Sequence, residues 1–256
     1  MPAAELDFAV LRSRGEIQSA RLELERRGLL ERPGPGARVR ALAFQALGRT
    51  DPLGHRTPDP IKSWDVLRAL DAIAATVDKD LPVLDMGSVG SAVPLALSRM
   101  GYTRVHGIDL DPRVTEMGTG RPIEYVVGDM TKTPWPDGRF AAITSMSVIE
   151  HGVDLDALLS ELSRLLQPGG VFLFSTDYWA EKLDTSDERI FGLPWTIFSA
   201  EEIEAFVARA GSHGLQPAGE VDYRSPADGD RPIHFGGRSY TFLYGALVKR
   251  DHPVSG

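Results

Sequence analysis

The sequence predicts an α/β fold in which helices cover both faces of a doubly wound, mostly parallel, Rossmann-like sheet. Two observations carry this prediction. From residue 81 onward, short apolar runs alternate with stretches whose apolar residues recur every three or four positions, which is typical of strand–helix–strand units. Glycine, proline and aspartate separate these runs, as the turns between strands and helices require.

Composition and charge narrow the class of protein. The chain has 256 residues and no cysteine, which excludes disulfides and thiolate chemistry. No apolar run approaches the roughly 20 residues that cross a bilayer. The first residues are acidic where a secretion signal is basic, so we expect a cytoplasmic protein without membrane contact. The net charge of −8 repels phosphate backbones and predicts that nucleic acid is not a partner.

The chain divides into three parts by composition. Residues 1–60 form an N-terminal extension of helix-patterned, charged residues that end near Gly28 and give way to loops rich in proline and glycine. Residues 61–250 form the main domain, and residues 251–256 form a tail. The sequence leaves two roles open for the extension, a cap over the site or the contact surface of a homodimer.

The elements of the main domain follow in order after an amphipathic helix over residues 61–77. Strands are expected over residues 83–86, 104–110, 123–129, 139–147, 171–178, 214–223 and 239–250. Helical segments are expected over residues 91–100, 111–118, 154–170 and 199–211. Glycines 169 and 170 are expected to stop the third of these. Ser199 and Glu202 form a capping box that opens the fourth.

Three of these strands end in an acidic residue. Asp85 closes the first strand, Asp109 the second and Asp129 the third. The carboxyl ends of parallel strands meet at one edge of a doubly wound sheet, where ligands bind. Asp109 lies 24 residues beyond Asp85, near the spacing of ~20 at which an acid reaches a ribose diol. The alternative, that each aspartate is only a helix cap or turn former, explains one such acid more readily than three.

The spacing alone fits a nicotinamide cofactor as well as an adenosine-bearing methyl donor. Asp85 stands at a turn that would cradle phosphate, where a negative charge is unfavourable. A ligand with a sulfonium and an amino-acid tail carries net positive charge, and its carboxylate can meet the free amides after Gly90. Asp129 is suited to accept a hydrogen bond from the adenine amine. Together these observations favour the methyl donor.

Over residues 61–250 the chain resembles the class I S-adenosylmethionine-dependent methyltransferases. The resemblance rests on four motifs in this order: VLDMGSVGS, VHGIDLDP, IEYVVGDMTKTPWPDGRFAAITSMSVIEH and LSRLLQPGGVFLFSTDY. It implies a seven-stranded sheet with an antiparallel last strand and S-adenosyl-L-methionine as cofactor. It also implies that Asp85 and Gly87 border the methionine part, Asp109 the ribose, and Asp129 with Met130 the adenine. The candidate cofactor residues are Asp85, Gly87, Ser88, Gly90, Asp109, Leu110, Asp129, Met130 and Met146.

The chain departs from the family pattern at three positions. Val89 and Ser91 occupy two of the glycine positions in the turn that follows the first strand, and Val89 has a β-carbon that restricts backbone approach. Ala141 stands where the fourth strand of the family commonly has aspartate. Asp85 and Gly87 are therefore the best supported residues of the turn, and the acids at the strand ends are unaffected.

Methylation of a hydroxyl or ammonium group requires that the acceptor lose a proton. His151 follows the fourth strand and is the candidate base, because an ordinary histidine pKa is ~6.5. Asp177, at the end of the fifth strand, is the second candidate catalytic residue. A purely structural histidine is an equal alternative. The candidate acceptor-binding residues are Trp64, Tyr178, Trp179, Trp195, His234 and Arg238, although the tryptophans would serve equally as anchors of a lid.

The sequence therefore predicts a methyltransferase that acts on an oxygen or nitrogen of a small molecule, such as a sugar, a glycoside or another specialised metabolite. Two alternatives stay open: a nicotinamide-dependent oxidoreductase, and a non-catalytic cofactor-binding protein of the same fold. Carboxylates after the fifth strand suit Mg²⁺ chemically. Acidic loops are common, however, and we predict no required metal.

Overall fold

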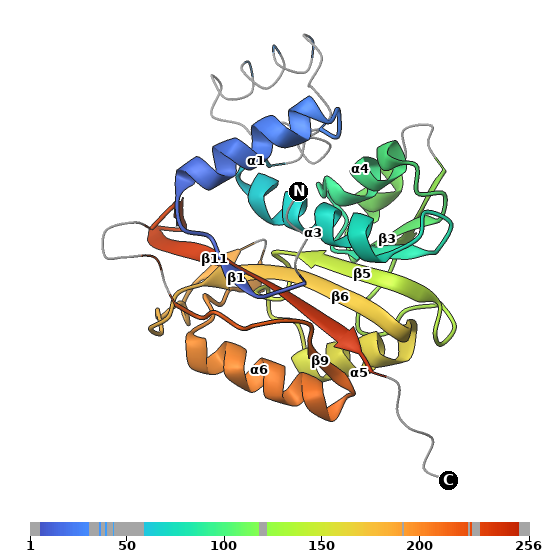
Figure 1. Ribbon diagram of the computed structural model, residues 1–256. Coiled ribbons are helices and arrows are strands. Elements are labelled where there is room, and N and C mark those ends of the chain that lie inside the picture. Colours follow the sequence, from blue (N-terminus) through green and yellow to red (C-terminus); the bar gives the residue numbers. More distant parts are fainter. Residues whose placement is uncertain are drawn as a thin grey trace.

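The computed structural model describes residues 6–30, 59–117, 122–190, 192–224 and 231–250, together with Gly36, Val39, Ala43 and Pro226. Within these ranges a central sheet lies between two layers of helices, as the sequence predicts (Figure 1). Most of the N-terminal extension after residue 30 and the whole predicted tail, residues 251–256, lie outside the described residues. Each described helix is too short or too polar to span a bilayer.

The sheet is doubly wound. Its parallel strands run in the order β4-β3-β2-β5-β6, and β11 continues the sheet antiparallel to β6. The short strands β1, β9 and β10 each pair with β11. The strands are β1 (Ala9–Val10), β2 (Val83–Met86), β3 (Val105–Asp109), β4 (Ile123–Val127), β5 (Phe140–Met146), β6 (Leu166–Tyr178), β9 (Leu215–Pro217), β10 (Ile233–Phe235) and β11 (Arg238–Lys249). All seven predicted strands are present, and β1 and β10 are additions too short to show a period in the sequence.

Helices cover the two faces of the sheet separately. In Figure 1, α1, α3 and α4 lie on one side of the sheet and α5 and α6 on the other. The helices are α1 (Arg14–Arg26), α3 (Ser63–Thr76), α4 (Val93–Met100), α5 (Leu155–Leu165) and α6 (Ala200–Ser212), with 3₁₀ turns η2 (Pro60–Lys62) and η3 (Pro112–Glu116). A small hairpin of β7 (Arg189–Ile190) and β8 (Leu193–Pro194) lies apart from the main sheet. Each layer encloses its own apolar cluster.

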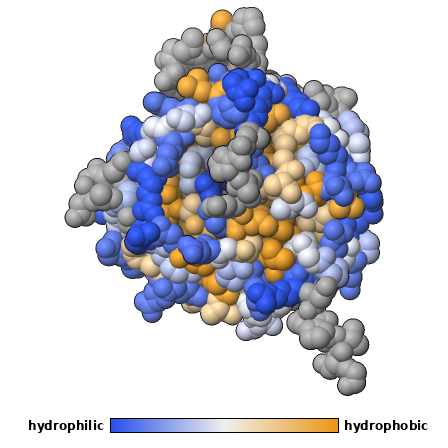
Figure 2. All heavy atoms as spheres, in the orientation of Figure 1, coloured by the Kyte–Doolittle hydropathy of each residue, from blue (hydrophilic) through white to orange (hydrophobic). Residues whose placement is uncertain are grey.

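The described part of the N-terminal extension is built into this fold. Strand β1 adds to β11, and Leu24 of α1 is fully buried beside α3. An ion pair joins Arg27 of α1 to Asp71 of α3. The sequence predicted exposed helices here, whereas α1 buries one face because its apolar residues recur at helical spacing. In the same orientation, Figure 2 shows hydrophilic residues around the outline and apolar residues gathered toward the middle.

The predicted helix over residues 154–170 is shorter in the structure. Helix α5 ends at Leu165, and Leu166 already belongs to β6. Gly169 has a φ of 74°, a left-handed conformation that a side chain would strain. A β-carbon at Gly170 would lie 2.8 Å from the Gln167 carbonyl oxygen. The two glycines therefore form a tight irregularity inside β6 rather than the stop of the helix.

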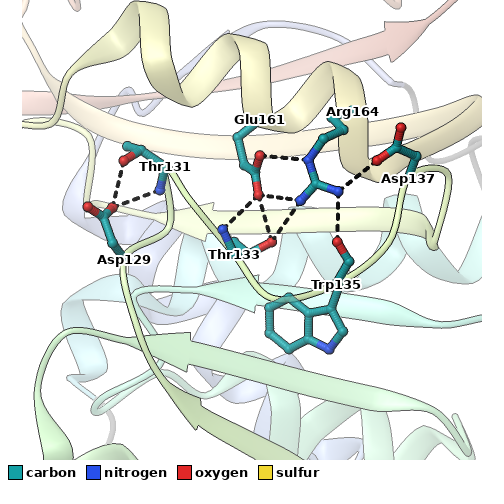
Figure 3. Close-up of polar contacts among 7 residues, drawn as sticks. All are labelled: Asp129, Thr131, Thr133, Trp135, Asp137, Glu161 and Arg164. Carbon is teal, nitrogen blue, oxygen red and sulfur yellow. Dashed lines mark hydrogen bonds and ion pairs between the residues drawn. The ribbon is translucent and has the colours of Figure 1, made fainter.

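A network of polar contacts fastens the loop between β4 and β5 to helix α5 (Figure 3). The buried Glu161 accepts hydrogen bonds from the Thr133 backbone N–H at 2.8 Å and the Thr133 hydroxyl at 2.7 Å. Arg164 donates to both Glu161 oxygens and to the Trp135 carbonyl at 2.7 Å. These contacts hold the pKa of Glu161 below its usual value, against the effect of its burial. The loop carries Asp129 and Met130, so the network fixes one side of the predicted site.

We expect Glu161→Ala to lower the free energy of unfolding by about 1–3 kcal/mol, because it leaves the Thr133 N–H and part of Arg164 without an acceptor. Urea denaturation of both proteins measures this difference. Glu25→Ala removes an exposed ion pair with Arg21 on α1 and is the matched control, with an expected loss below about 0.5 kcal/mol. Equal losses in the two variants would contradict a structural role for the network.

Candidate functional site

The carboxyl edge of the parallel strands brings most predicted cofactor residues to one place. The direction of the winding reverses between β2 and β5, because β3 and β4 lie on one side of β2 and β5 and β6 on the other. A ligand binds in the crevice at such a switch point in open α/β sheets. Residues at the ends of β2, β3 and β5 therefore define the centre of the candidate site.

The turn after β2 is anchored from beneath by Asp85. This carboxylate is 1% exposed and accepts hydrogen bonds from the Thr144 hydroxyl at 2.6 Å and the Ser88 hydroxyl at 2.7 Å. Burial raises its pKa to about 6, and the two hydroxyls act in the opposite direction. Asp85 thus lies under the turn, tying it to β5. Contact between this carboxylate and a ligand stays a prediction.

The turn itself has no room for a side chain at Gly87. Its φ is 77°, and a β-carbon there would lie 2.4 Å from a methyl carbon of Val148. Gly90 has the same left-handed φ. Gly87 lets the backbone pass close to the segment that follows β5, and the Gly87 and Ser88 N–H groups donate to the Ile108 carbonyl of β3 at 2.9 and 3.2 Å. The turn is therefore tight although Val89 and Ser91 replace two glycines of the family pattern.

Asp109 holds the same turn from the side of β3. One of its carboxylate oxygens accepts from the Val89 backbone N–H at 2.9 Å, and the other accepts from the Asp111 N–H at 2.9 Å. The next residue, Leu110, is 66% exposed. An exposed apolar side chain beside a half-buried carboxylate suits a ligand with a flat ring and a sugar diol, because one surface stacks and the other accepts hydrogen bonds.

Asp129 and Met130 stand at the neighbouring strand end. Asp129 is exposed, and Thr131 donates to its Oδ1 through both its backbone N–H and its hydroxyl at 2.8 Å (Figure 3). Met130 is buried beneath the loop. Met146 closes β5 and is partly exposed.

The segment after β5 places Glu150 and His151 beside the cation of Lys62. Burial, together with the charge of Lys62, lowers the pKa of His151 to about 4. His151 is therefore neutral at neutral pH and able to accept a proton. Burial raises the pKa of the buried Glu150 well above its usual value, the Asp177 charge raises it further, and Lys62 acts in the opposite direction. Neither Glu150 nor Lys62 was singled out from the sequence, where the only signal for Glu150 is its position before His151.

Asp177 supports the insertion that follows β6. Its Oδ2 accepts a hydrogen bond from the Trp195 indole N–H at 2.7 Å. Burial raises the pKa of Asp177, while the Lys62 charge and the bonds from Trp195 and Tyr240 lower it. Trp195 is 2% exposed and packs edge-on against Tyr240 and Phe235. The contact of Asp177 with Trp195, rather than with His151, indicates a positioning role for this carboxylate.

The predicted aromatic wall is mostly buried in the structure. Trp64 and Trp179 are buried, with the Arg68 and Arg231 guanidinium groups over their rings at 5.4 and 4.1 Å. The Tyr178 hydroxyl donates to the Tyr223 carbonyl on the opposite side of the sheet. Trp179, like Trp195, anchors the insertion after β6 to the core, and contact of these aromatic side chains with an acceptor stays a prediction.

The hairpin of β10 and β11 presents the remaining candidates. His234 is exposed, and its Nδ1 lies 2.6 Å from the Ser239 hydroxyl. Arg238 donates to the Asp184 carbonyl at 3.0 Å and lies 3.6 Å from a Glu188 oxygen, so it joins the hairpin to the insertion after β6. The predicted cofactor residues thus lie along β2, β3 and β4, with Met146 at the end of β5, and this edge is called the cofactor half below. The predicted catalytic and acceptor residues lie mainly after β5 and along β6 and β11, a region called the acceptor half.

A family model described as a methyltransferase domain matches residues 84–174, which run from β2 into β6. A ubiquinone biosynthesis O-methyltransferase of Paramagnetospirillum magneticum is 35% identical over 102 residues. That stretch is 38% of this chain and 40% of the relative, so the chain spans well under two thirds of that relative's length.

Two solved structures share the fold. An S-adenosylmethionine-dependent methyltransferase from Mesorhizobium loti is 20% identical with a TM-score of 0.52, covering 73% of this chain and 97% of that one. The [4+2]-cyclase SpnF is 16% identical with a TM-score of 0.57, covering 96% and 100%. Residues 84–174 therefore match a methyltransferase domain, and the chain shares its fold with an S-adenosylmethionine-dependent methyltransferase.

The low pKa of His151 has a testable cause. Lys62→Met should raise the pKa of His151 from about 4 toward its ordinary 6.5 without reaching it, because burial is the larger cause and stays in place. NMR titration of the imidazole measures the shift. A folded-state pKa below 6.5 means that the unfolded chain binds more protons between pH 6.5 and 4, so this contribution to stability falls as the pH falls. Lys132→Met, in the loop after β4, should leave the pKa of His151 unchanged.

Proposed function

We propose that the chain is an S-adenosylmethionine-dependent methyltransferase that methylates an oxygen or nitrogen of a small molecule. The observation that carries this proposal is the arrangement of the edge formed by β2, β3 and β4. There the tight turn at Gly87 and Gly90, the Asp109 carboxylate and the exposed Leu110 lie next to one another. This set of groups fits the amino-acid tail, the ribose and the adenine of the donor in that order along the edge.

The residues fit the donor better than they fit a dinucleotide. A pyrophosphate would bring two negative charges to a turn bordered by Asp109 and underlain by Asp85. A sulfonium with an ammonium brings positive charge to the same place. The Val148 side chain occupies the space over Gly87, so we place the methionine part of the donor along the turn beside this contact. The nicotinamide-dependent oxidoreductase is accordingly the weaker alternative.

When bound, the donor supplies a methyl group on positively charged sulfur, and the chain's own residues must align the acceptor and remove its proton. Alignment of reacting groups is worth up to ~7–11 kcal/mol of the barrier. His151 is neutral and lies on the acceptor half, where it can take a proton from a hydroxyl or ammonium group. The insertion that Trp195 fixes to Asp177 of β6 lies on this half, and we take it to favour a small molecule over a protein as acceptor. A sugar, glycoside or other specialised metabolite fits such a site, which we place in the cytoplasm.

Two further parts of the proposal rest on sequence and charge. The excess of carboxylates argues against nucleic acid as a partner. Within the described residues, no three His, Asp or Glu side chains gather as a metal would need, and we propose a reaction that requires no metal. The described part of the extension packs on α3 and β11 rather than standing free, which supports a structural role for residues 6–30.

Isothermal titration calorimetry with S-adenosylmethionine, S-adenosylhomocysteine and NAD⁺ tests the cofactor assignment. We expect heat with the first two ligands and none with NAD⁺. Heat with NAD⁺ alone would overturn the proposal in favour of an oxidoreductase. Donor binding without formation of S-adenosylhomocysteine across a panel of phenols, sugars and amines would favour the non-catalytic alternative.

Asp109→Ala should weaken donor binding about 10–100-fold, because it removes a charged acceptor for the ribose and frees the Val89 N–H that it holds. Calorimetry with S-adenosylhomocysteine measures the change. Asp80→Ala alters an exposed aspartate before β2, at the opposite end of the strand, and should leave binding within about twofold. Unchanged affinity in Asp109→Ala would remove this carboxylate from the cofactor site.

A further inference from the structure

Ser147 has an unusual backbone at the junction of the two halves of the site. Its φ is 53°, and among the described residues it is the one non-glycine residue in the left-handed region. A side chain in that region costs of order 1–3 kcal/mol, and such strain gathers at functional sites. The conformation is held in place because the Ser147 N–H donates to the Ser175 carbonyl of β6 at 3.0 Å.

The neighbours of Ser147 place it next to both predicted ligands. It follows Met146 at the carboxyl end of β5 and precedes Val148, whose side chain fills the space over Gly87. On its other side the chain runs on to Glu150 and His151 of the acceptor half. Ser147 is partly exposed, so its hydroxyl is accessible at this boundary.

A chain of hydrogen bonds leads from Ser147 into the protein. The Ser147 and Ser175 hydroxyl oxygens lie 3.4 Å apart, and the Ser175 hydroxyl donates to Oδ2 of Asp65 at 2.6 Å. Because the Ser175 hydroxyl donates its hydrogen to Asp65, its oxygen can only accept a hydrogen bond from Ser147. Ser175 and Asp65 are both fully buried. The buried Asp65 carboxylate is thus connected through the Ser175 hydroxyl to the partly exposed Ser147.

Asp65 is not explained as a helix cap alone. It lies in the first turn of α3, and its Oδ1 accepts the Val66 N–H at 3.0 Å, while Oδ2 is committed to Ser175 of another element. Burial raises its pKa, and the Lys62 charge lowers it. A buried carboxylate whose affinity for a proton is increased, at the inner end of a hydroxyl chain, is suited to receive one.

We infer that Ser147, Ser175 and Asp65 form a proton relay that deprotonates the acceptor, with the Ser147 hydroxyl in contact with the acceptor's O–H or N–H. The inference rests on the proposed function and moves the role of base from His151 to this relay. As the acceptor atom bonds to the methyl carbon and the sulfur–methyl bond breaks with its electrons left on sulfur, the acceptor's proton passes to the Ser147 oxygen. The Ser147 proton passes to Ser175, and the Ser175 proton to Asp65. The separation of 3.4 Å is long for such a transfer, and it is expected to shorten when a ligand is bound.

The relay separates the effect of Ser147 on stability from its effect on rate. Ser147→Gly removes the hydroxyl and also relieves the left-handed strain, so the melting temperature should stay equal or rise while kcat falls 10–1000-fold and donor affinity stays within twofold. Ser145→Ala is the matched control, because it removes a buried hydroxyl on the same strand and should leave kcat within about threefold. Wild-type kcat in Ser147→Gly would overturn the relay.

The inner end of the relay is tested by Asp65→Asn, which keeps the shape of the side chain and removes the proton acceptor. The rate should fall by a similar factor, and the acidic limb of the kcat profile against pH that Asp65 contributes should disappear. The double variant with Ser147→Gly should be no slower than the slower single variant, because the groups act as one unit. An unaltered pH profile, or losses that multiply, would contradict the relay.

A titration without turnover provides an independent measurement. The groups that face Asp65 are Lys62 of η2, Ser175 of β6 and Tyr244 of β11. Burial raises the pKa of Tyr244, and the charge of Asp65 is among those that raise it further. NMR titration of carboxyl-labelled aspartate should show a higher pKa for Asp65 in Ser175→Ala, because that variant removes a bond to the charged form. An unchanged pKa would contradict the hydrogen bond between Ser175 and Asp65 on which the relay depends.

The two proposals fail by different results. If wild-type protein bound the donor and methylated nothing, the proposed function would fail. A fully active Ser147→Gly would contradict the relay alone.

Discussion

The position of one turn governs the rest of the candidate site. The turn after β2 is held by two carboxylates, Asp85 from below through Ser88, and Asp109 from the side through the Val89 N–H. Asp85 also binds Thr144 of β5, so the same group joins the strands on either side of the switch point. A buried charge is costly unless it is hydrogen-bonded. The bonds that compensate Asp85 are therefore the bonds that fix the turn, and stability and ligand geometry have a common origin.

The acceptor half depends on a different anchor. Trp195 lies in an insertion with little regular structure, yet its indole bonds Asp177 and its backbone carbonyl accepts the Thr185 hydroxyl at 2.6 Å. The Thr196 N–H donates to the Glu150 carbonyl at 2.9 Å, so the insertion is fixed to the segment that carries His151. These contacts fix the insertion to β6 and to the segment after β5.

Much of this arrangement could be predicted from the sequence because it follows from periodicity and caps. The alternation of strands and helices, the capping box of Ser199 and Glu202, and the acids at three strand ends are all local patterns, and both bonds of the capping box are present. What could not be predicted depends on residues distant in sequence. Lys62 lies near Glu150 and His151 only after folding, and the Ser147 conformation is imposed by a bond to β6. The aromatic residues predicted to line the acceptor site were identified by type, and type alone does not distinguish a wall from an anchor.

The fold by itself does not decide the chemistry, since a cyclase shares it over nearly the whole chain. A donor cradle is needed for methyl transfer but is not sufficient for it, because an acceptor that keeps its proton is a poor nucleophile. His151 is neutral but has a depressed pKa, which makes it a weak holder of a proton, whereas burial raises the proton affinity of Asp65 and Glu150. The acceptor's proton must therefore pass to another group at this edge. Buried carboxylates reached through hydroxyls are better proton acceptors than the imidazole, because burial favours their protonated form and disfavours the protonated form of His151.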